Sequence, residues 1–232
     1  MFGQNPIRKQ VVDNGEKLWV QEVFPTLQGE GPFVGWPSVF VRLAGCNLRC
    51  YFCDTEFESS QWHPTLDELL ENIEQHLQSL PHCRLIVLTG GEPFRQNITP
   101  LVNRLLASNK LVQIETAGTL GLDHFPYTHN NLHIVCSPKT PQVDVSMRYA
   151  NAWKYVINGD IDLTDGLPLN STQIAGKKSR IARPTNDAPV YVMPCDEKNA
   201  QKNAAHQKSA TDIAMRYGYR LCLQLHKIVD IP

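Results

Sequence analysis

Eight short runs rich in β-branched and aromatic residues recur along the chain of 232 residues, and they limit its fold more than any other feature. Most of these runs are continuously apolar and do not alternate with polar residues. That pattern is typical of parallel strands that are covered on both faces. We therefore expect strands at residues 18–24, 38–44, 84–90, 111–117, 132–138, 153–157, 190–194 and 220–226.

Three helical segments are expected between these runs. Residues 65–80 begin with Thr65 and have Glu68 three positions later, which is the pattern of a capping box, and the leucines that follow keep a helical spacing. Residues 98–109 and 197–218 are the other two segments. Strands that alternate with helices predict βα units around a mainly parallel sheet.

The βα pattern is incomplete, which limits the architecture. Residues 118–131 are few and rich in turn formers, and residues 158–189 are polar, with Gly, Pro, Asn and Asp throughout, and predict no particular structure. There are too few βα units for a closed eight-stranded barrel of about 250 residues. We expect an α/β fold, a partial, open (β/α) barrel with a mainly parallel sheet, formed by residues 1–232 as one domain.

Composition narrows the class of protein. A formal net charge of -1 argues against a protein built mainly to bind polyanions. No run of about 18 apolar residues suggests a membrane span, and the first ten residues lack the apolar core of a signal peptide. Seven cysteines, an odd number, suit a reducing compartment better than a disulfide framework. We expect a cytoplasmic enzyme.

Three cysteines are clustered in "GCNLRCYFCDTEF", residues 45–57. The spacing C-x3-C-x2-C lets Cys46, Cys50 and Cys53 face one centre, as the ligands of an iron–sulfur cluster do. A structural zinc site needs a fourth ligand, and the nearest histidine, His63, has no regular spacing to the cysteines, so zinc remains the weaker alternative. Free cysteine is commonly a small buried apolar residue, and this is the interpretation for Cys83, Cys136, Cys195 and Cys222.

The segment "CNLRCYFC", with Phe52 before its last cysteine, resembles the signature of the radical S-adenosylmethionine superfamily. The resemblance implies that the three cysteines hold three irons of a 4Fe-4S cluster and that the fourth iron binds S-adenosylmethionine. "TGGEP", residues 89–93, follows an expected strand and resembles a superfamily segment that contacts S-adenosylmethionine. Its two glycines allow the backbone to approach a ligand closely.

Longer stretches resemble the 7-carboxy-7-deazaguanine synthase family, at residues 24–57, 87–93, 113–119, 137–139 and 223–232. The resemblance implies a radical-mediated ring contraction of 6-carboxy-5,6,7,8-tetrahydropterin to 7-carboxy-7-deazaguanine, with release of ammonium, in queuosine and 7-deazapurine biosynthesis. It also implies Mg²⁺ as a further cofactor, an electron donor such as flavodoxin or ferredoxin, and a homodimer. Direct binding of nucleic acid or a membrane is not expected.

The same resemblance assigns binding roles to residues, and it assigns no side chain a catalytic role. The expected metal ligands are Cys46, Cys50 and Cys53 for the cluster, and Thr55, a hard hydroxyl oxygen, for Mg²⁺. The expected substrate-binding residues are Leu27, Gln28, Gly29, Arg42, Thr89 and Pro232, the last through its terminal carboxylate. The expected S-adenosylmethionine-binding residues are Phe52, Cys53, Asp54, Gly91, Ser137, Pro138, Lys139, Met193, Pro194, Cys195 and Asp196.

Elementary chemistry supports some of these roles independently. A guanidinium on a strand, such as that of Arg42, is costly to bury unless it faces an anion; a surface arginine at a strand edge is the alternative. Glu115 and Thr116 end an expected strand, and sites gather at the carboxyl ends of parallel strands. A rival function is an activating enzyme for a glycyl-radical system. A zinc-binding nucleic-acid module is a weaker rival, because it predicts basic patches and stacked aromatics that the sequence does not show.

Overall fold

A computed structural model of the protein describes residues 5–53, 55–173 and 179–231. These residues form a single eight-stranded sheet whose spatial order follows the sequence. β1 pairs antiparallel with β2, and all the later neighbours pair parallel. The strands are β1 (Val20–Leu27), β2 (Pro37–Leu43), β3 (Leu85–Gly90), β4 (Leu111–Thr116), β5 (Leu132–Cys136), β6 (Ala152–Ile157), β7 (Val190–Pro194) and β8 (Arg220–Leu221).

Helices connect some of the strands, as the sequence predicts. They are α1 (Leu66–Gln78) between β2 and β3, α2 (Thr99–Ala107) between β3 and β4, α3 (Ala200–Tyr217) between β7 and β8, and the short α4 (Leu225–Ile228). Single 3-10 turns lie at η1 (Gly31–Phe33), η2 (Pro93–Arg95) and η3 (Val145–Tyr149). The predicted capping box of α1 is present: Glu68 N donates to Thr65 Oγ1 at 3.3 Å, and Thr65 N donates to Glu68 Oε2 at 2.8 Å.

The end of the chain differs from the prediction. Residues 220–226 were expected to form one strand, but β8 ends at Leu221, and α4 begins at Leu225. The backbone leaves the sheet because Leu225 N donates to the carbonyl of Gly29 at 3.1 Å, beyond the end of β1. Hydrogen bonding to a distant segment therefore replaces the strand that the apolar pattern predicted.

The two faces of the sheet differ in polarity, because successive side chains of a strand point to opposite faces. On β6, Trp153 and Tyr155 are fully buried in the main apolar core beneath the helices, while Lys154 between them points to the other face. On β4, Ile114 is in that core, while Glu115 lines a cavity on the opposite side. The helix-covered face therefore forms the core, and the inner face is polar.

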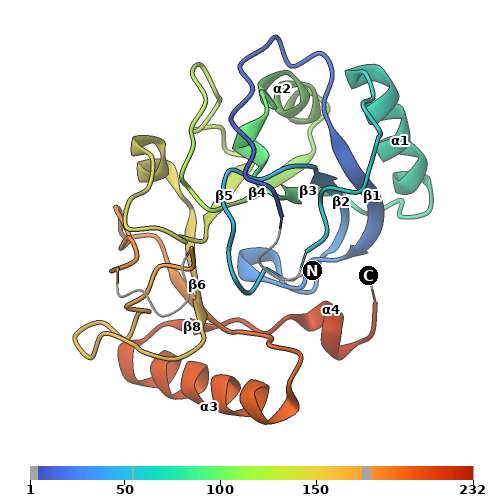
Figure 1. Ribbon diagram of the computed structural model, residues 1–232. Coiled ribbons are helices and arrows are strands. Elements are labelled where there is room, and N and C mark those ends of the chain that lie inside the picture. The colour runs from blue at the N-terminus through green and yellow to red at the C-terminus, as the bar shows by residue number, and fades with distance from the viewer. Residues whose placement is uncertain (1–4, 54, 174–178, 232) are drawn as a thin grey trace.

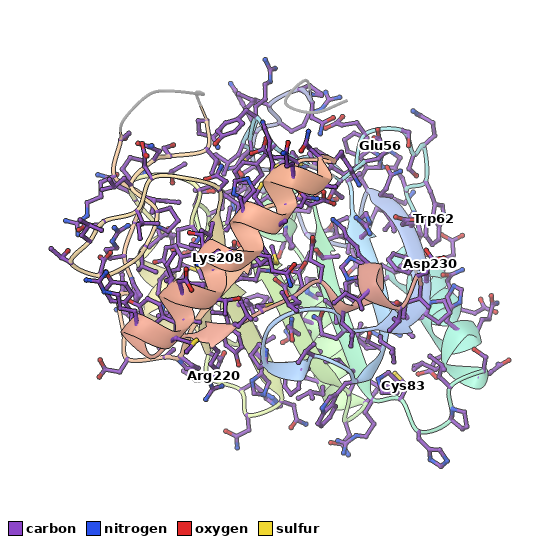
Figure 2. The ribbon with its side chains drawn as sticks, turned by 90° about the horizontal axis from the view of Figure 1, so that it is seen from below. Glu56, Trp62, Cys83, Lys208, Arg220 and Asp230 are labelled. Carbon is purple, nitrogen blue, oxygen red and sulfur yellow. The ribbon has the colours of Figure 1, made fainter. Side chains whose placement is uncertain are left out.

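The sheet is curved but not closed. Figure 1 shows α1, α2 and α3 around the outside of the strands and the C-terminal segment, with α4, returning from β8 toward β1. This arrangement is the predicted open barrel. Figure 2 shows α3 lying across one side of the molecule with Lys208 on it, and this exposed residue pairs with Asp212 one turn later at 2.7 Å. Among the described residues, no helix is both long and apolar enough to cross a membrane.

Candidate active site

A cavity of about 410 Å³ lies on the inner face of the sheet and reaches the carboxyl ends of the parallel strands. It brings together most of the site residues that the sequence predicts: Leu27, Gln28, Arg42, Cys46, Cys50, Phe52, Cys53, Thr55, Thr89, Gly91, Ser137, Lys139, Met193, Pro194, Cys195 and Asp196. Glu115 and Thr116 also line it, as expected. Gly29 and Pro138 are not among its lining residues. Asp54 and Pro232 lie outside the described residues.

The cysteine loop forms one wall of this cavity. Cys46 is buried and Cys50 and Cys53 are half-buried, and none of the three is joined in a disulfide bond. Leu48 N donates to Cys46 Sγ at 3.4 Å, and Thr172 Oγ1 donates to Cys50 Sγ at 2.9 Å. Hydrogen bonds to ligand sulfurs are typical of iron–sulfur sites.

The protonation of the Cys46 thiol depends on whether a metal centre is bound beside it. Burial, and next the nearby Glu92 carboxylate, raise the pKa of the Cys46 thiol well above its usual range. A bound cation centre reverses this effect, because metal coordination holds a thiol as thiolate. Within the described part of the chain, no three His, Cys, Asp or Glu side chains are placed to hold a single metal ion. The other four cysteines are buried, as predicted.

Gly90 and Gly91 allow the end of β3 to pack against the end of β2 and the start of the cysteine loop. Gly90 has a φ of +130°, and a Cβ added there would lie 2.0 Å from the carbonyl oxygen of Leu43. A Cβ on Gly91 would lie 2.1 Å from the carbonyl oxygen of Gly45. Gly91 N donates to Leu43 O at 3.0 Å, which fixes this approach. Gly90 therefore leaves room for the end of β2 and Gly91 for the start of the cysteine loop, and both glycines line the cavity.

The glutamate that follows these glycines is completely buried. Glu92 accepts hydrogen bonds from Thr116 Oγ1 at 2.7 Å and Ala117 N at 2.8 Å, so it joins the ends of β3 and β4. Burial raises the pKa of this carboxyl, although the three donors that reach it oppose the change. Its role here is to fix the rim of the cavity.

A buried lysine lies between two carboxylates on the inner face. Lys154 Nζ is 2.5 Å from Glu30 Oε2 and 2.6 Å from Glu115 Oε2, and Lys154 is 7% exposed. Gln28 and Gln113 both donate to Glu115 Oε1, at 3.4 and 2.5 Å. The three charged groups therefore form one fixed polar network that lines the cavity.

The charges in this network depend on one another. Burial alone would raise the pKa of Glu30, but the Lys154 ammonium and the hydrogen bonds from Lys154 and Gln224 outweigh it and lower that pKa to about 2. Burial raises the pKa of Glu115, and the repulsion from Glu30 adds to this, against the attraction of Lys154. Burial would lower the pKa of Lys154, but the two carboxylates raise it above its ordinary value. Lys154 is therefore protonated at neutral pH.

Arg42 faces the cavity from β2 and already has an anionic neighbour. Its Nε lies 2.7 Å from Glu22 Oε1 on β1, although the pair is not aligned as a hydrogen bond. Its guanidinium carbon lies 5.4 Å from the centre of the Phe24 ring. Arg42 is therefore not a surface arginine at a strand edge, because it lines the cavity and only 23% of its side chain is exposed.

The segments expected to bind S-adenosylmethionine are held by polar contacts. Lys139 Nζ donates to Ser137 O at 2.8 Å, and burial lowers the pKa of this ammonium. Asp196 accepts from Lys227 Nζ at 2.8 Å and from Lys198 N at 2.9 Å, and the hydrogen bond from Lys227 is the main reason that the pKa of Asp196 is lowered. The Asp196 contact joins the end of β7 to α4.

Gly29 supports the cavity without lining it. A Cβ at this position would lie 2.1 Å from His226 Nδ1, so only glycine leaves room for α4 to pack against residues 27–29. His226 itself lines the cavity. The expected substrate-binding segment and the C-terminal segment are therefore in contact.

Several residues of the site were not predicted from the sequence. Lys154 carried a signal, because a single lysine stands inside the otherwise apolar run "WKYVI". Glu30 lies in residues 24–57, which resemble the 7-carboxy-7-deazaguanine synthase family, but it was not singled out from the sequence. Thr172 and Gln173 carried no signal, since they lie in the polar stretch for which no structure was predicted.

Comparison with known proteins gives consistent results. Residues 41–147 match the model of the radical SAM superfamily. The chain is 52% identical to the 7-carboxy-7-deazaguanine synthase of Rhodospirillum rubrum, over 100% of both chains. It is 37% identical to the enzyme of the same name from Rickettsia prowazekii, over 100% of this chain and 96% of the relative.

A solved structure shares the fold. The crystal structure of QueE from Escherichia coli matches with a TM-score of 0.65 and 22% identity, covering 90% of this chain and 95% of that one. At this level of identity the match shows a shared fold. Given the cysteine loop, the cavity and the full-length identity to curated relatives, the chain belongs to the 7-carboxy-7-deazaguanine synthase family of the radical S-adenosylmethionine superfamily.

Proposed function

We propose that the protein catalyses the ring contraction of 6-carboxy-5,6,7,8-tetrahydropterin to 7-carboxy-7-deazaguanine, with release of ammonium, in queuosine or 7-deazapurine biosynthesis. The observation that supports this most is that one cavity has the three cluster cysteines on one wall and the Glu30–Lys154–Glu115 network on another. This combination suits a small polar heterocycle that must lie next to a radical-generating centre. Membership of the family supports the same reaction.

The cofactors provide the difficult chemistry, and the protein holds them. When bound, the 4Fe-4S cluster and S-adenosylmethionine supply the electron and the carbon-centred radical that removes a hydrogen atom from the substrate. In this proposal, Cys46, Cys50 and Cys53 hold the cluster and leave one corner open. The residues proposed to hold S-adenosylmethionine are Phe52, Asp54, Gly91, Ser137, Pro138, Lys139, Met193, Pro194, Cys195 and Asp196.

The substrate is proposed to lie against the inner face of the sheet. Gln28 and Thr89 offer hydrogen bonds there, and the carbonyl of Gly29 holds the neighbouring C-terminal segment. Arg42 supplies a cation for the substrate carboxylate, in competition with Glu22. Thr55 is proposed to supply a hard oxygen to Mg²⁺ beside that carboxylate.

Further proposals concern the protein's partners. We infer that a low-potential protein such as flavodoxin or ferredoxin supplies the electron and that the enzyme is a cytoplasmic homodimer. Residues 1–232 are proposed to act as one domain, in line with the single continuous sheet of the described residues. The substrate is a small molecule, and the proposal requires no direct contact with nucleic acid or a membrane.

An anaerobic turnover assay tests the function. Reconstituted protein, S-adenosylmethionine, dithionite, Mg²⁺ and the carboxytetrahydropterin should yield 7-carboxy-7-deazaguanine and ammonium, detected by mass spectrometry and an ammonium assay. The variant Cys50→Ala should yield neither product. Cleavage of S-adenosylmethionine without any change of the pterin would refute the proposed substrate and would favour an activating enzyme.

A further inference from the structure

A short segment far from the cysteine loop in sequence contacts its middle cysteine. Residues 171–173 lie in a stretch without helix or extended strand among its described residues, and Ser171 and Thr172 are 9% and 6% exposed. Thr172 Oγ1 lies 2.9 Å from Cys50 Sγ, and Gln173 Nε2 lies 3.2 Å from the same sulfur. Two side-chain donors therefore converge on one ligand sulfur.

The orientation of both donors is fixed by their other partners. Gln173 Oε1 accepts from Arg49 N at 3.0 Å, so the amide nitrogen must face the sulfur. That nitrogen also donates to Thr172 Oγ1 at 3.0 Å, which uses a lone pair of the hydroxyl. The Thr172 hydroxyl proton can then reach Cys50 Sγ at 2.9 Å or Lys139 O at 3.3 Å, and the sulfur is the nearer acceptor.

The backbone of the segment is attached on both sides. Tyr51 N donates to Thr172 O at 3.1 Å, and Thr172 N donates to Lys139 O at 3.1 Å. Ser171 Oγ donates to the same carbonyl at 3.0 Å. Residues 171–173 therefore bridge the cysteine loop and the segment 137–139, so the donors keep their distance from the sulfur.

The cysteines differ in these contacts. Cys46 Sγ accepts a backbone N–H, from Leu48 at 3.4 Å, whereas Cys50 Sγ is approached by two side chains at shorter distances. Hydrogen bonds to the sulfurs are among the factors that set the reduction potential of an iron–sulfur cluster. Donors stabilise the reduced, more negative state, and hydrogen bonds to charged groups are stronger than those between neutral groups.

We propose that Thr172 and Gln173 are positioning residues that raise the reduction potential of the cluster by donating hydrogen bonds to the sulfur of Cys50. The electron itself comes from the external low-potential donor, and the two residues change only how readily the cluster accepts it. The inference rests on the proposed cluster but not on the identity of the substrate.

The test is a redox titration of the reconstituted cluster, followed by electron paramagnetic resonance in the absence of pterin. Thr172→Val and Gln173→Leu should each lower the reduced-to-oxidised ratio at a fixed potential by about tenfold, which is about 59 mV for a one-electron couple. Thr172→Ser, which keeps the hydroxyl, should restore the wild-type potential. Thr164→Val is the matched control, because its hydroxyl donates to Asp162 Oδ1 at 2.6 Å and not to a cysteine.

The outcomes separate tuning from a purely structural role. The proposal would be overturned if both variants bind as much iron and sulfide as wild type and have the same reduction potential as wild type. It would also be overturned if Thr164→Val shows the same change in reduction potential as the two variants. If Thr172→Val fails to assemble a cluster, Gln173→Leu alone decides by the same criterion. If the variants show the expected change in reduction potential but the wild-type protein does not convert the pterin, this inference is supported and only the proposed function is refuted.

Discussion

Lys154 is the residue on which the charge balance of the inner face depends. It lies between Glu30 and Glu115, which are otherwise two carboxylates in one buried network. Other titratable groups near this network come from different elements: Lys139 after β5, Cys222 after β8 and His226 on α4. Removing the one cation at the centre should therefore have consequences that removing a surface lysine does not.

Replacing Lys154 by methionine should destabilise the protein by about 3–5 kcal/mol, because it leaves two buried carboxylates without the cation that pairs with both of them. Those carboxylates should then have raised pKa values and remain protonated in the folded state. If the pKa of a glutamate is higher in the folded than in the unfolded state, the free energy of unfolding falls as the pH rises above the unfolded pKa, which is about 4.3. The loss of stability relative to wild type should therefore grow from pH 5 to pH 8, as measured by urea denaturation.

A second substitution serves as the control for this result. Glu30→Gln in the Lys154→Met background removes one of the two carboxylates and should recover part of the stability at pH 8. A destabilisation that does not vary with pH would contradict the charge argument and leave only lost packing.

Gly91 provides another prediction at this scale. In Gly91→Ala, the new Cβ would lie 2.1 Å from the carbonyl oxygen of Gly45 and so displace the cysteine loop. The iron content after reconstitution should fall well below that of wild type, while the far-ultraviolet circular dichroism stays similar. Gly218→Ala is the comparison, because its Cβ meets no atom within 4 Å although its φ is 72°. A wild-type iron content in Gly91→Ala would show that the loop tolerates the displacement.

At the scale of elements, α1 shows a local sequence signal acting as predicted. Its capping box uses only residues three positions apart, so it forms as soon as the helix does. Its buried face, including Leu69, Ile73 and Leu77, then packs into the main core. The helix is therefore specified by its own sequence and positioned by the sheet.

Thr65→Ala should lower the free energy of unfolding by about 1 kcal/mol, the usual cost of removing an N-cap. Hydrogen bonds from the backbone and then the side chain of Thr65 lower the pKa of Glu68. Because this pKa is lower in the folded state, ionised Glu68 stabilises the fold at pH values above its unfolded pKa, and this contribution is lost as the pH falls. The difference between wild type and variant, measured by urea denaturation, should therefore shrink in acid. Thr65→Ser should behave like wild type; a full loss in that variant would assign the effect to packing of the methyl group.

For the whole molecule, the cluster should act as a cross-link between distant parts of the fold. The cysteine loop contacts the segment after β3, where Glu92 N donates to Gly45 O, and it contacts the segment 171–173 through Cys50. Because the ligands gather only in the folded state, cluster binding adds to folding stability. The open side of the barrel makes this contribution more important than in a closed barrel.

Removal of the cluster by a chelator under anaerobic conditions should therefore lower the melting temperature, measured by differential scanning fluorimetry. The matched control is a variant with alanine at positions 46, 50 and 53, whose melting temperature should not respond to iron and sulfide. Equal melting temperatures of the cluster-bound and cluster-free proteins would contradict a cross-linking role.

Much of the fold could be predicted from the sequence because its signals are local. Seven of the expected strands appear close to their expected bounds, because the apolar pattern that predicts each strand lies within the strand itself. The eighth was shortened by the contact between Leu225 and Gly29, which no local pattern encodes. The cysteine loop was equally readable, because Cys46, Cys50 and Cys53 are neighbours in sequence.

The chain by itself thus determined the strands, the capping box of α1 and the close spacing of the three cysteines, all of which depend on intervals of a few residues. Only the tertiary structure decided which polar groups share the cavity. Lys154 meets Glu30 across 124 positions, and Thr172 meets Cys50 across 122. The physical reason is that the curved sheet brings inward-pointing side chains of distant segments into one cavity. The residue period of a strand predicts which side chains share a face, but it does not predict how the sheet curves.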